Sequence, residues 1–175
     1  MEKSKQRIYT IILFAVFALS LYIVEWSGIG SSAVAKYNQG YGTFDMKSYS
    51  TEGVAEVLDR MEPQGFIVYR LYFVADYFFV LTFGLLQITL LYLTYQWTRP
   101  GIRQLLYCVP ILRGICDIIE NTLLLWTLNH YPDINRQVIQ AASAATTMKL
   151  ALIRVWSVIF LVGIVVSFVK RRQKK

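Results

Sequence analysis

The sequence predicts an all-α integral membrane protein, a bundle of four transmembrane helices that forms one domain over residues 1–175. Three observations predict this fold class. The chain is 55% hydrophobic with a mean hydropathy of +0.43, which is above the usual apolar content of soluble domains. Four apolar stretches are long enough to supply the roughly 20 helical residues that cross a bilayer. The basic residues gather at the span ends that a four-span topology places on one side of the membrane.

The first expected span covers about residues 8–25. It follows the charged segment 1–7, and Ala33-Val34-Ala35 looks like the cleavage site of a signal peptide. The apolar run is longer than the hydrophobic region of most signal peptides, and the Ala-x-Ala lies about ten residues beyond its end. These features favour an uncleaved span, and a cleaved one stays open as the alternative.

The first outer loop is expected to cover about residues 27–65. Its start at 28–32 has the Gly and Ser content of a flexible segment. Apolar residues recur at helical spacing over 52–61, which predicts a short amphipathic helix. We expect its apolar face to pack on the outer end of the bundle; lying on the membrane surface is the alternative.

The ends of this short helix are predicted from local residues. Ser50 or Thr51 is a good N-cap, because a side-chain oxygen there can accept a bond from a free helical N–H. Pro63 and Gly65 are expected to stop the helix.

The second and third spans are expected at about residues 66–95 and 105–128. A tight turn at Arg99-Pro100-Gly101 joins them into an antiparallel hairpin. Pro110 lies inside the third span, where it removes one backbone hydrogen bond and is expected to kink the helix. The fourth span is expected at about 144–169, and the stretch 134–143 is expected to begin its helix.

The charge distribution predicts the topology. The net charge is +7, and 10 of the 18 basic residues flank the predicted inner ends of the spans. The positive-inside rule therefore places both termini in the cytoplasm and the protein in the cell membrane as a multi-pass protein. Nucleic acid is not an expected partner, because no basic stripe alternates with aromatic residues that could stack on bases. The flanking residues are Lys3, Lys5, Arg7, Arg99, Arg103, Lys170, Arg171, Arg172, Lys174 and Lys175.

Five ionisable residues lie deep inside the apolar stretches. They are Glu25, Asp76, Asp117, Glu120 and Arg154. Counted at 1.5 Å per residue from the inner ends, all five fall in the outer half of a hydrocarbon core about 30 Å thick. A charge at the centre of a bilayer costs about 2.5–3.5 kcal/mol on insertion scales, so such groups are expected to pair or to serve a function.

Helical spacing also places polar residues on single faces. On the third span, the spacing i, i+4, i+7 and i+8 is shared by Arg113, Asp117, Glu120 and Asn121. On the second span, the spacing i, i+3 and i+7 is shared by Tyr69, Tyr72 and Asp76. We therefore expect these two faces to meet.

The fourth span is expected to turn Arg154 toward this cluster, together with Thr147 and Ser157. Lys149 is five residues from Arg154, so we expect it to point away and to reach the outer headgroups.

The predicted ligand-binding residues contain four acids and only two bases. Either some carboxylates are protonated or a cation fills the gap. The group could be an ion-pair network that fixes helix packing, or a polar pocket open to the outer leaflet; the excess of acid favours the pocket. The residues are Glu25, Tyr69, Tyr72, Asp76, Arg113, Asp117, Glu120, Asn121 and Arg154.

Other site chemistries find little support. His130 is the single histidine, which excludes a multi-His zinc site. Cys108 and Cys116 are eight residues apart on one helix, about 12 Å, which is too far for a disulfide or a shared zinc ion. No cofactor or metal is expected, and no catalytic residue is assigned. If a reaction occurs, it would be proton transfer by a buried carboxylate.

Several short motifs carry a resemblance that covers about residues 44–150. They are Phe44-Asp45, Ser48-Tyr49-Ser50, Asp76, Pro110, Asp117-x-x-Glu120-Asn121, and Thr146 with Lys149. In these the chain resembles an uncharacterised group of small, mostly bacterial, four-span integral membrane proteins. The resemblance implies the four-span fold and no known activity.

A second likeness is architectural. The chain is similar in size and span number to the EXPERA domain of sterol isomerases and sigma-type ligand-binding proteins. That likeness implies acidic residues facing a central cavity that binds cationic amphiphiles or sterols. The motif residues of that domain do not align with this chain, so no catalytic role is carried over.

The leading functional hypothesis is that an acidic cavity in the outer half of the bilayer binds a cationic or hydroxylated lipid-like small molecule. The alternative is a non-enzymatic accessory or assembly subunit whose buried polar network is structural. A third hypothesis is a cation- or proton-coupled transporter that works as an oligomer, because four spans alone leave little room for alternating access. The expected partners are membrane lipids, and a homo-oligomer or a membrane-protein partner is left open.

Overall fold

The computed structural model describes residues 3–173, and its secondary structure is entirely helical. Within these residues, three stretches are long and apolar enough to cross a membrane: Ser4–Tyr37, Pro63–Thr94 and Arg136–Lys170. The expectation of an all-α protein with membrane-spanning helices is confirmed at this level. Lys174 and Lys175, which were counted in the basic tail, lie outside the described residues. The helices are α1 (Lys3–Trp26), α2 (Ser31–Tyr37), α3 (Thr51–Asp59), α4 (Pro63–Thr94), α5 (Pro100–His130) and α6 (Arg136–Arg172).

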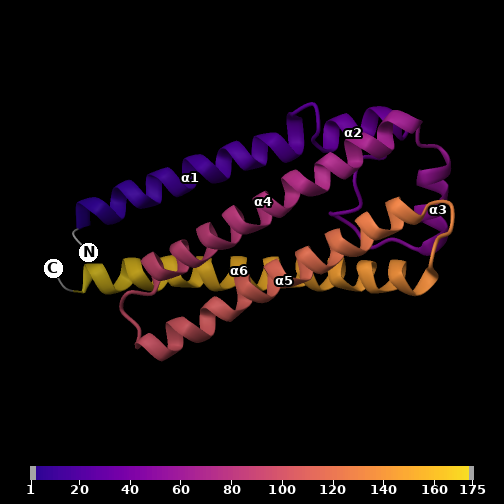
Figure 1. Cartoon of the computed structure of the whole chain (residues 1–175). Coiled ribbons are helices and arrows are strands. Elements are labelled where there is room, and N and C mark those ends of the chain that lie inside the picture. Colours follow the sequence, from indigo (N-terminus) through magenta and orange to yellow (C-terminus); the bar gives the residue numbers. More distant parts are fainter. Residues whose placement is uncertain (1–2, 174–175) are drawn as a thin grey trace.

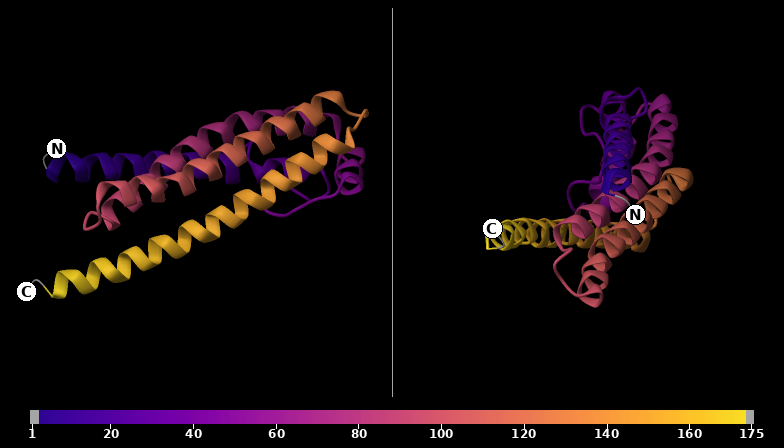
Figure 2. Two further views of the ribbon diagram at one scale, coloured as in Figure 1. Left: turned by 90° about the horizontal axis from the view of Figure 1, so that it is seen from below. Right: turned by 90° about the vertical axis from the view of Figure 1, so that its left-hand side faces the viewer.

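The four long helices α1, α4, α5 and α6 lie side by side (Figure 1). Helix α4 is central, because it contacts α1, α5 and α6, whereas α1 does not contact α6 in the described chain. Both chain termini lie at one end of the molecule, which we call the terminal end (Figure 1). Helices α2 and α3 lie at the opposite end, called the loop end. Figure 2 shows that α6 diverges from the other helices toward the terminal end.

Among the local predictions near the helix ends, the N-cap of α3 is confirmed and three others need correction. Ser50 caps α3 by accepting a hydrogen bond from the Gly53 N–H, as expected. Pro63 does not stop α3, which ends earlier at Asp59; it begins α4, where the missing N–H needs no partner. Pro100 likewise starts α5 and is not the centre of a turn. The segment expected to be flexible contains the start of α2 at Ser31.

The hydrophobic core of the described chain lies at the loop end. Helix α3 buries its apolar face there, as its amphipathic pattern predicts. Aromatic rings from the outer loop stack on α4, with Phe44 next to Tyr69, and Tyr69 stacked on Phe73 at 4.8 Å between ring centroids. The loop end is therefore closed by packed side chains, which keeps water away from the groups beneath it.

The terminal end is held by a few side-chain contacts between α6 and the residues that directly follow α4. The Tyr95 hydroxyl donates to the Ile159 carbonyl at 2.6 Å, and the Trp97 indole donates to Ser167 at 3.1 Å. The Tyr95 ring lies so close to Gly163 that a Cβ there would overlap it. A glycine at this position lets the two helices approach each other.

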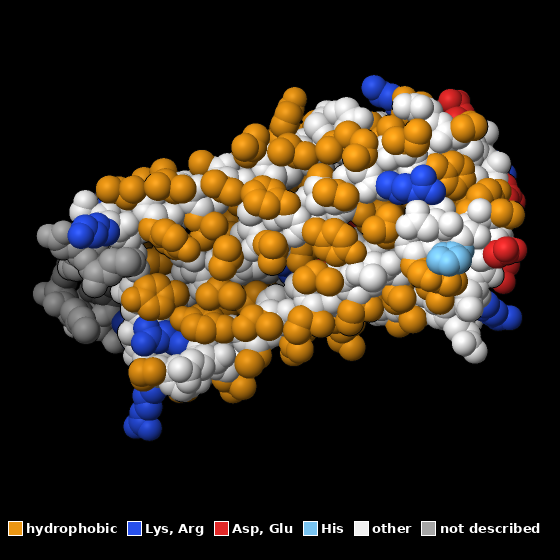
Figure 3. Space-filling model, viewed as in Figure 1, with side chains coloured by type: hydrophobic (Ala, Val, Ile, Leu, Met, Phe, Trp, Pro, Cys, Tyr) orange, Lys and Arg blue, Asp and Glu red, His pale blue; other side chains and the backbone are white. Residues whose placement is uncertain are grey.

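On the face shown in Figure 3, apolar side chains cover much of the long helices between their two ends. In this view the Asp and Glu side chains of the described chain lie at the loop end (Figure 3). Large exposed apolar residues include Ile11, Leu81, Leu105, Leu161 and Val165. An apolar surface of this extent suits lipid and not water.

Candidate functional site

Charged and polar side chains from three helices and the outer loop meet in the half of the molecule nearer the loop end. All of them are buried, with at most 8% of their surface exposed. Burying so many charges is costly unless they are paired and hydrogen-bonded. We call this group the buried polar cluster, and its members are Asp45, Asp76, Arg113, Asp117, Glu120, Asn121, Thr146 and Lys149.

Lys149 of α6 forms the centre of the cluster. Its Nζ lies 2.5 Å from Glu120 Oε2, 3.0 Å from Asp117 Oδ1 and 3.8 Å from an Asp45 oxygen. The expectation that Lys149 reaches the outer headgroups was wrong. The reason is the buried face of α6, on which Ile139, Ala142, Thr146 and Lys149 follow one another at spacings of three and four residues.

Arg113 of α5 is the second buried cation. One guanidinium nitrogen donates to Asp117 Oδ2 at 2.8 Å, one helical turn along α5, as its spacing predicts. Another donates to the Val80 carbonyl of α4 at 3.1 Å. The guanidinium carbon also lies 4.6 Å from the centre of the Phe83 ring, a cation–π contact. Asp117 is thus held between two cations, Arg113 and Lys149.

Asp76 of α4 is held differently. It accepts a hydrogen bond of 2.6 Å from the Asn121 side-chain amide. None of the ion pairs formed within residues 3–173 includes Asp76. This carboxyl group is buried and hydrogen-bonded, but it has no cation of its own.

Glu120 is bound to α6 by a hydroxyl as well as by Lys149. Thr146 donates to Glu120 Oε1 at 2.6 Å, and its oxygen lies 3.2 Å from the Tyr49 hydroxyl. Burial raises the pKa of Tyr49, a residue of the outer loop, so its hydroxyl stays neutral. The backbone N–H of Tyr49 donates to Ser143 at 3.0 Å, which fixes this part of the loop on α6.

The outer loop supplies a carboxylate that the site prediction omitted. Asp45 accepts a hydrogen bond from the Tyr72 hydroxyl of α4. The preceding residue, Phe44, is fully buried, and its N–H donates to the Tyr69 hydroxyl at 3.2 Å. Tyr69 and Tyr72 therefore hold the loop so that Asp45 points inward. The only sequence signal for Asp45 was the Phe-Asp pair in the resemblance, to which no role was attached.

Two predicted site residues lie apart from the cluster. Arg154 is exposed on α6, and no ion pair in the described part of the chain includes it. The prediction that Arg154 holds one of the acids was wrong, because Lys149 occupies that place. Glu25 is exposed on α1 and does not join the buried network, although it borders the cavity beside it.

A cavity of about 370 Å³ lies next to the cluster. Its walls come from α1, α4, α5, α6 and the outer loop. Apolar walls are formed by residues such as Leu21, Phe79 and Ile153. Tyr72 lines the cavity, whereas Tyr69, Glu120 and Asn121 do not. The charged residues in the wall are Glu25, Asp45, Asp76, Arg113, Asp117 and Lys149.

The wall of this cavity carries four acids and two bases. The predicted site also contained four acids and two bases, but not the same residues. Asp45 and Lys149 are in the cavity wall, while Glu120 and Arg154 are not. The arrangement gives the cavity an acidic and an apolar part. Such a site can bind a positively charged or hydroxyl-bearing group next to an apolar one.

The arrangement offers no evident metal centre. Within residues 3–173, no three His, Cys, Asp or Glu side chains are grouped so that they could hold a metal ion. Cys108 is exposed and Cys116 is half-buried, and both are free thiols.

No family model matches the chain, and comparisons with curated proteins and with solved structures found no match.

Proposed function

We propose that α5 is a fourth membrane-crossing helix and that the chain is a four-span bundle in the cell membrane with both termini in the cytoplasm. Helix α5 has 31 residues, which gives a length of about 46 Å. Its charged residues Arg113, Asp117 and Glu120 are buried against other helices, while Ile111 and Ile115 of the same stretch are exposed. The helix therefore offers apolar side chains to lipid although its average hydropathy is reduced by charge.

The orientation follows from the charges at the two ends. Residues 3–20, 90–105 and 160–173, which form the terminal end, contain no Asp or Glu but several Lys and Arg. The positive-inside rule places such an end in the cytoplasm. A reporter that is active only outside the cytoplasm should work when inserted between α5 and α6 and fail between α4 and α5. Equal activity at both places would contradict the topology.

We propose that the acidic cavity binds a cationic or hydroxylated lipid-like small molecule. The observation that carries this proposal is the surplus of carboxylates over bases, four to two, in a cavity wall that also has an apolar part. A purely structural network would be expected to balance its charges, because an uncompensated buried charge is costly. A ligand cation or a hydroxyl donor can supply the missing partner.

In this proposal the residues of the cavity wall have different roles. Asp76 and Asp45 contact the polar group of the ligand, because neither has a close cation of its own: Asp76 has none, and Asp45 lies 3.8 Å from Lys149. Arg113 and Lys149 fix Asp117 in the cavity wall. The apolar tail lies against Leu21, Phe79 and Ile153.

The position of the cavity supports entry from the lipid phase. Its wall includes Leu21 and Val24 of α1 and Leu150 and Ile153 of α6. These two helices do not contact each other in the part of the chain that the structure describes. A ligand dissolved in the outer leaflet can therefore reach the cavity between α1 and α6. The volume lies within the range of about 300–1,000 Å³ that is usual for small-molecule sites.

Asp76→Asn tests the proposal with little change in shape. The new amide oxygen still accepts a bond from Asn121, so the fold is kept while the charge is lost. We expect a long-chain alkyl quaternary ammonium to bind the variant about tenfold or more weakly, as the loss of one charge contact implies. Glu56→Gln removes an exposed acid from α3 and serves as the matched control.

Binding is measured on purified protein in non-ionic detergent, with an uncharged alkyl probe of equal length to correct for partitioning into the micelle. The lipids retained by wild type and by Asp117→Asn are compared by mass spectrometry in parallel. If Asp76→Asn and Glu56→Gln bind the cation as tightly as wild type, the proposed ligand class is wrong.

The accessory-subunit alternative also has an observation in its favour. Asp117 and Glu120 are fully engaged by Arg113, Lys149 and Thr146, as a structural network would be. Under this alternative, Asp117→Asn lowers thermal stability and changes co-purifying membrane proteins, while Asp76→Asn leaves bound amphiphiles unchanged. The ligand-binding and accessory-subunit hypotheses predict opposite results for Asp76→Asn. A binding titration of this variant with the cationic amphiphile therefore distinguishes them.

The resemblance to the small four-span group remains a proposal. Seven of the residues that carry it, from four separate segments, belong to the buried polar cluster: Asp45, Asp76, Asp117, Glu120, Asn121, Thr146 and Lys149. A motif shared by such a group would then mark one common site.

A further inference from the structure

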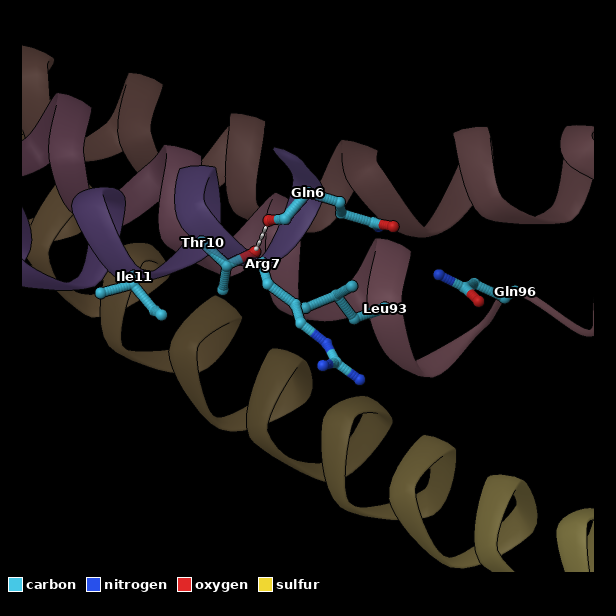
Figure 4. A pocket seen from close by; sticks show the side chains of 6 residues that line it. All are labelled: Gln6, Arg7, Thr10, Ile11, Leu93 and Gln96. Atoms are coloured by element: carbon cyan, nitrogen blue, oxygen red, sulfur yellow. Dashed lines mark hydrogen bonds between the residues drawn. The ribbon is translucent and has the colours of Figure 1, made fainter. Parts of the chain in front are cut away.

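A second cavity lies at the terminal end, between the first turns of α1 and the last turn of α4. Its volume is about 400 Å³. Figure 4 shows Gln6 and Arg7 of α1 extending toward Leu93 and Gln96, at and just after the end of α4, with α6 passing nearby. The acidic cavity begins more than a helical turn further along α1, so the two sites share no residue. The lining residues are Gln6, Arg7, Thr10, Ile11, Leu93 and Gln96.

The polar lining of this second cavity suits an anion. It contains one guanidinium, from Arg7, and two carboxamides, from Gln6 and Gln96, but no carboxylate. The Gln6 Nε2 atom is buried and has no hydrogen-bond partner among residues 3–173. A buried donor without a partner is unusual in folded proteins, and this one can donate to an acceptor that enters the cavity. Arg7 forms no ion pair with any described residue.

The residues near the second cavity are also positively charged. Lys5, Arg99, Arg103 and Lys170 lie in the segments that form the terminal end, and these segments contain no acid from residue 3 onward. An anion is therefore attracted to this end and meets no carboxylate among its described residues. The guanidinium of an arginine can bind two oxygens of one phosphate at once.

The apolar lining indicates what is attached to the anion. Ile11 of α1 and Leu93 of α4 are the apolar residues of the lining. Beyond Ile11 toward the loop end, α1 presents Phe14, which is 60% exposed, so the apolar surface continues along the helix. A free phosphate would leave this surface unused, whereas the acyl chains of a lipid would cover it.

We propose that this cavity binds the phosphate headgroup of an anionic phospholipid at the terminal end of the molecule. Arg7 pairs with the phosphate, the amides of Gln6 and Gln96 donate to its oxygens, and the acyl chains lie on Ile11 and Leu93. This site does not depend on the ligand of the acidic cavity. The proposal of a lipid at the second cavity can therefore be tested independently of the proposal for the acidic cavity.

The test uses the full chain in non-ionic detergent, with an equal mixture of phosphatidylglycerol and phosphatidylcholine. Native mass spectrometry then measures the lipid that stays bound. We expect wild type to retain phosphatidylglycerol in preference. Arg7→Gln should lower this retention about tenfold, the loss of one charge-assisted contact. Gln6→Leu should lower it as well, although it changes no charge.

Arg99→Gln is the matched control, because it removes one exposed charge from the same end but does not line the cavity. It should retain phosphatidylglycerol like wild type. Equal losses in Arg7→Gln and Arg99→Gln would overturn the proposal in favour of a diffuse basic surface. Displacement of the lipid by millimolar inorganic phosphate would overturn the assignment of a lipid; no displacement supports it. Unchanged melting curves for the variants confirm that each one is folded.

Discussion

The half of the molecule near the loop end and the half near the terminal end differ in where their charged residues lie, and α6 passes through both. Near the loop end, α6 buries Ile139, Thr146 and Lys149 on one face. Near the terminal end it exposes apolar residues such as Leu161 and Val165. The two buried cations of the first half, Arg113 and Lys149, are enclosed and paired with acids, whereas cations in the second half, such as Lys170, lie at helix ends.

The difference shows what decides whether a charge within an apolar helix contributes to the fold. Lys149 is stabilised because acids from the outer loop and α5 surround it. A lysine near the terminal end, such as Lys170, lies 3.9 Å from the centre of the Trp97 ring in a cation–π contact and pairs with no acid among the described residues. The following substitutions test this contrast.

Lys149→Met should have the largest effect. It leaves Asp117 and Glu120 buried beside each other without their shared cation, and breaking such a buried pair costs about 3–5 kcal/mol. The melting temperature of the purified protein in detergent should fall strongly. Lys170→Met removes a lysine from the same helix near the terminal end and should change the melting temperature little. Similar values for both variants would refute the contrast.

Tyr72→Phe should come next. It removes the hydroxyl that donates to the buried Asp45 carboxylate, a loss of about 1–3 kcal/mol. Tyr131→Phe, measured in the same melting assay, removes a similar bond to Asp59, but at an exposed position, and should cost less. A larger loss for Tyr131→Phe would mean that the loop is not held by Tyr72.

Gly163→Ala probes the half near the terminal end. The added methyl group overlaps the Tyr95 ring, which has to tilt away from the Ile159 carbonyl. Overpacking of this kind costs about 1–3 kcal/mol, and we expect the lower part of that range because a ring edge can move. Gly101→Ala, where a Cβ meets open space, is the control and should not lower the melting temperature. No difference between the two would show that the α4–α6 contact is loose.

Glu56→Gln should have the smallest effect. Glu56 pairs with Arg60 one turn away on α3, but both side chains are more than half exposed. Exposed pairs of this type contribute about 0.3–0.5 kcal/mol. The melting temperature should stay within the error of wild type, and a clear loss would indicate that α3 is held by more than its apolar face.

The sequence predicted the helices well because long apolar runs and turn residues are local signals. The predictions that were wrong at helix ends concern residues that are compatible with two positions. Pro63 can end one helix or begin the next, and here it begins α4. Helix α2 was missed because its seven residues are too short for a clear periodic pattern.

The candidate site was predicted in part. The spacing on the third span correctly grouped Asp117 with Arg113, and the structure places Asp76 beside Asn121. The choice between Arg154 and Lys149 was wrong, because two cations five residues apart cannot both face the same neighbour. The stripe that continues from Ile139 to Lys149 at helical spacing was the available signal.

The sequence by itself determined that the chain is helical and apolar, and that acids outnumber bases inside its apolar stretches. Those properties follow from side-chain chemistry and from spacings of a few residues. Only the tertiary structure decided which charges meet. Asp45 lies far from Lys149 in sequence, and their approach depends on Tyr69 and Tyr72 holding the loop against α4. Contacts between distant segments are set by the packing of whole helices, which no local pattern contains.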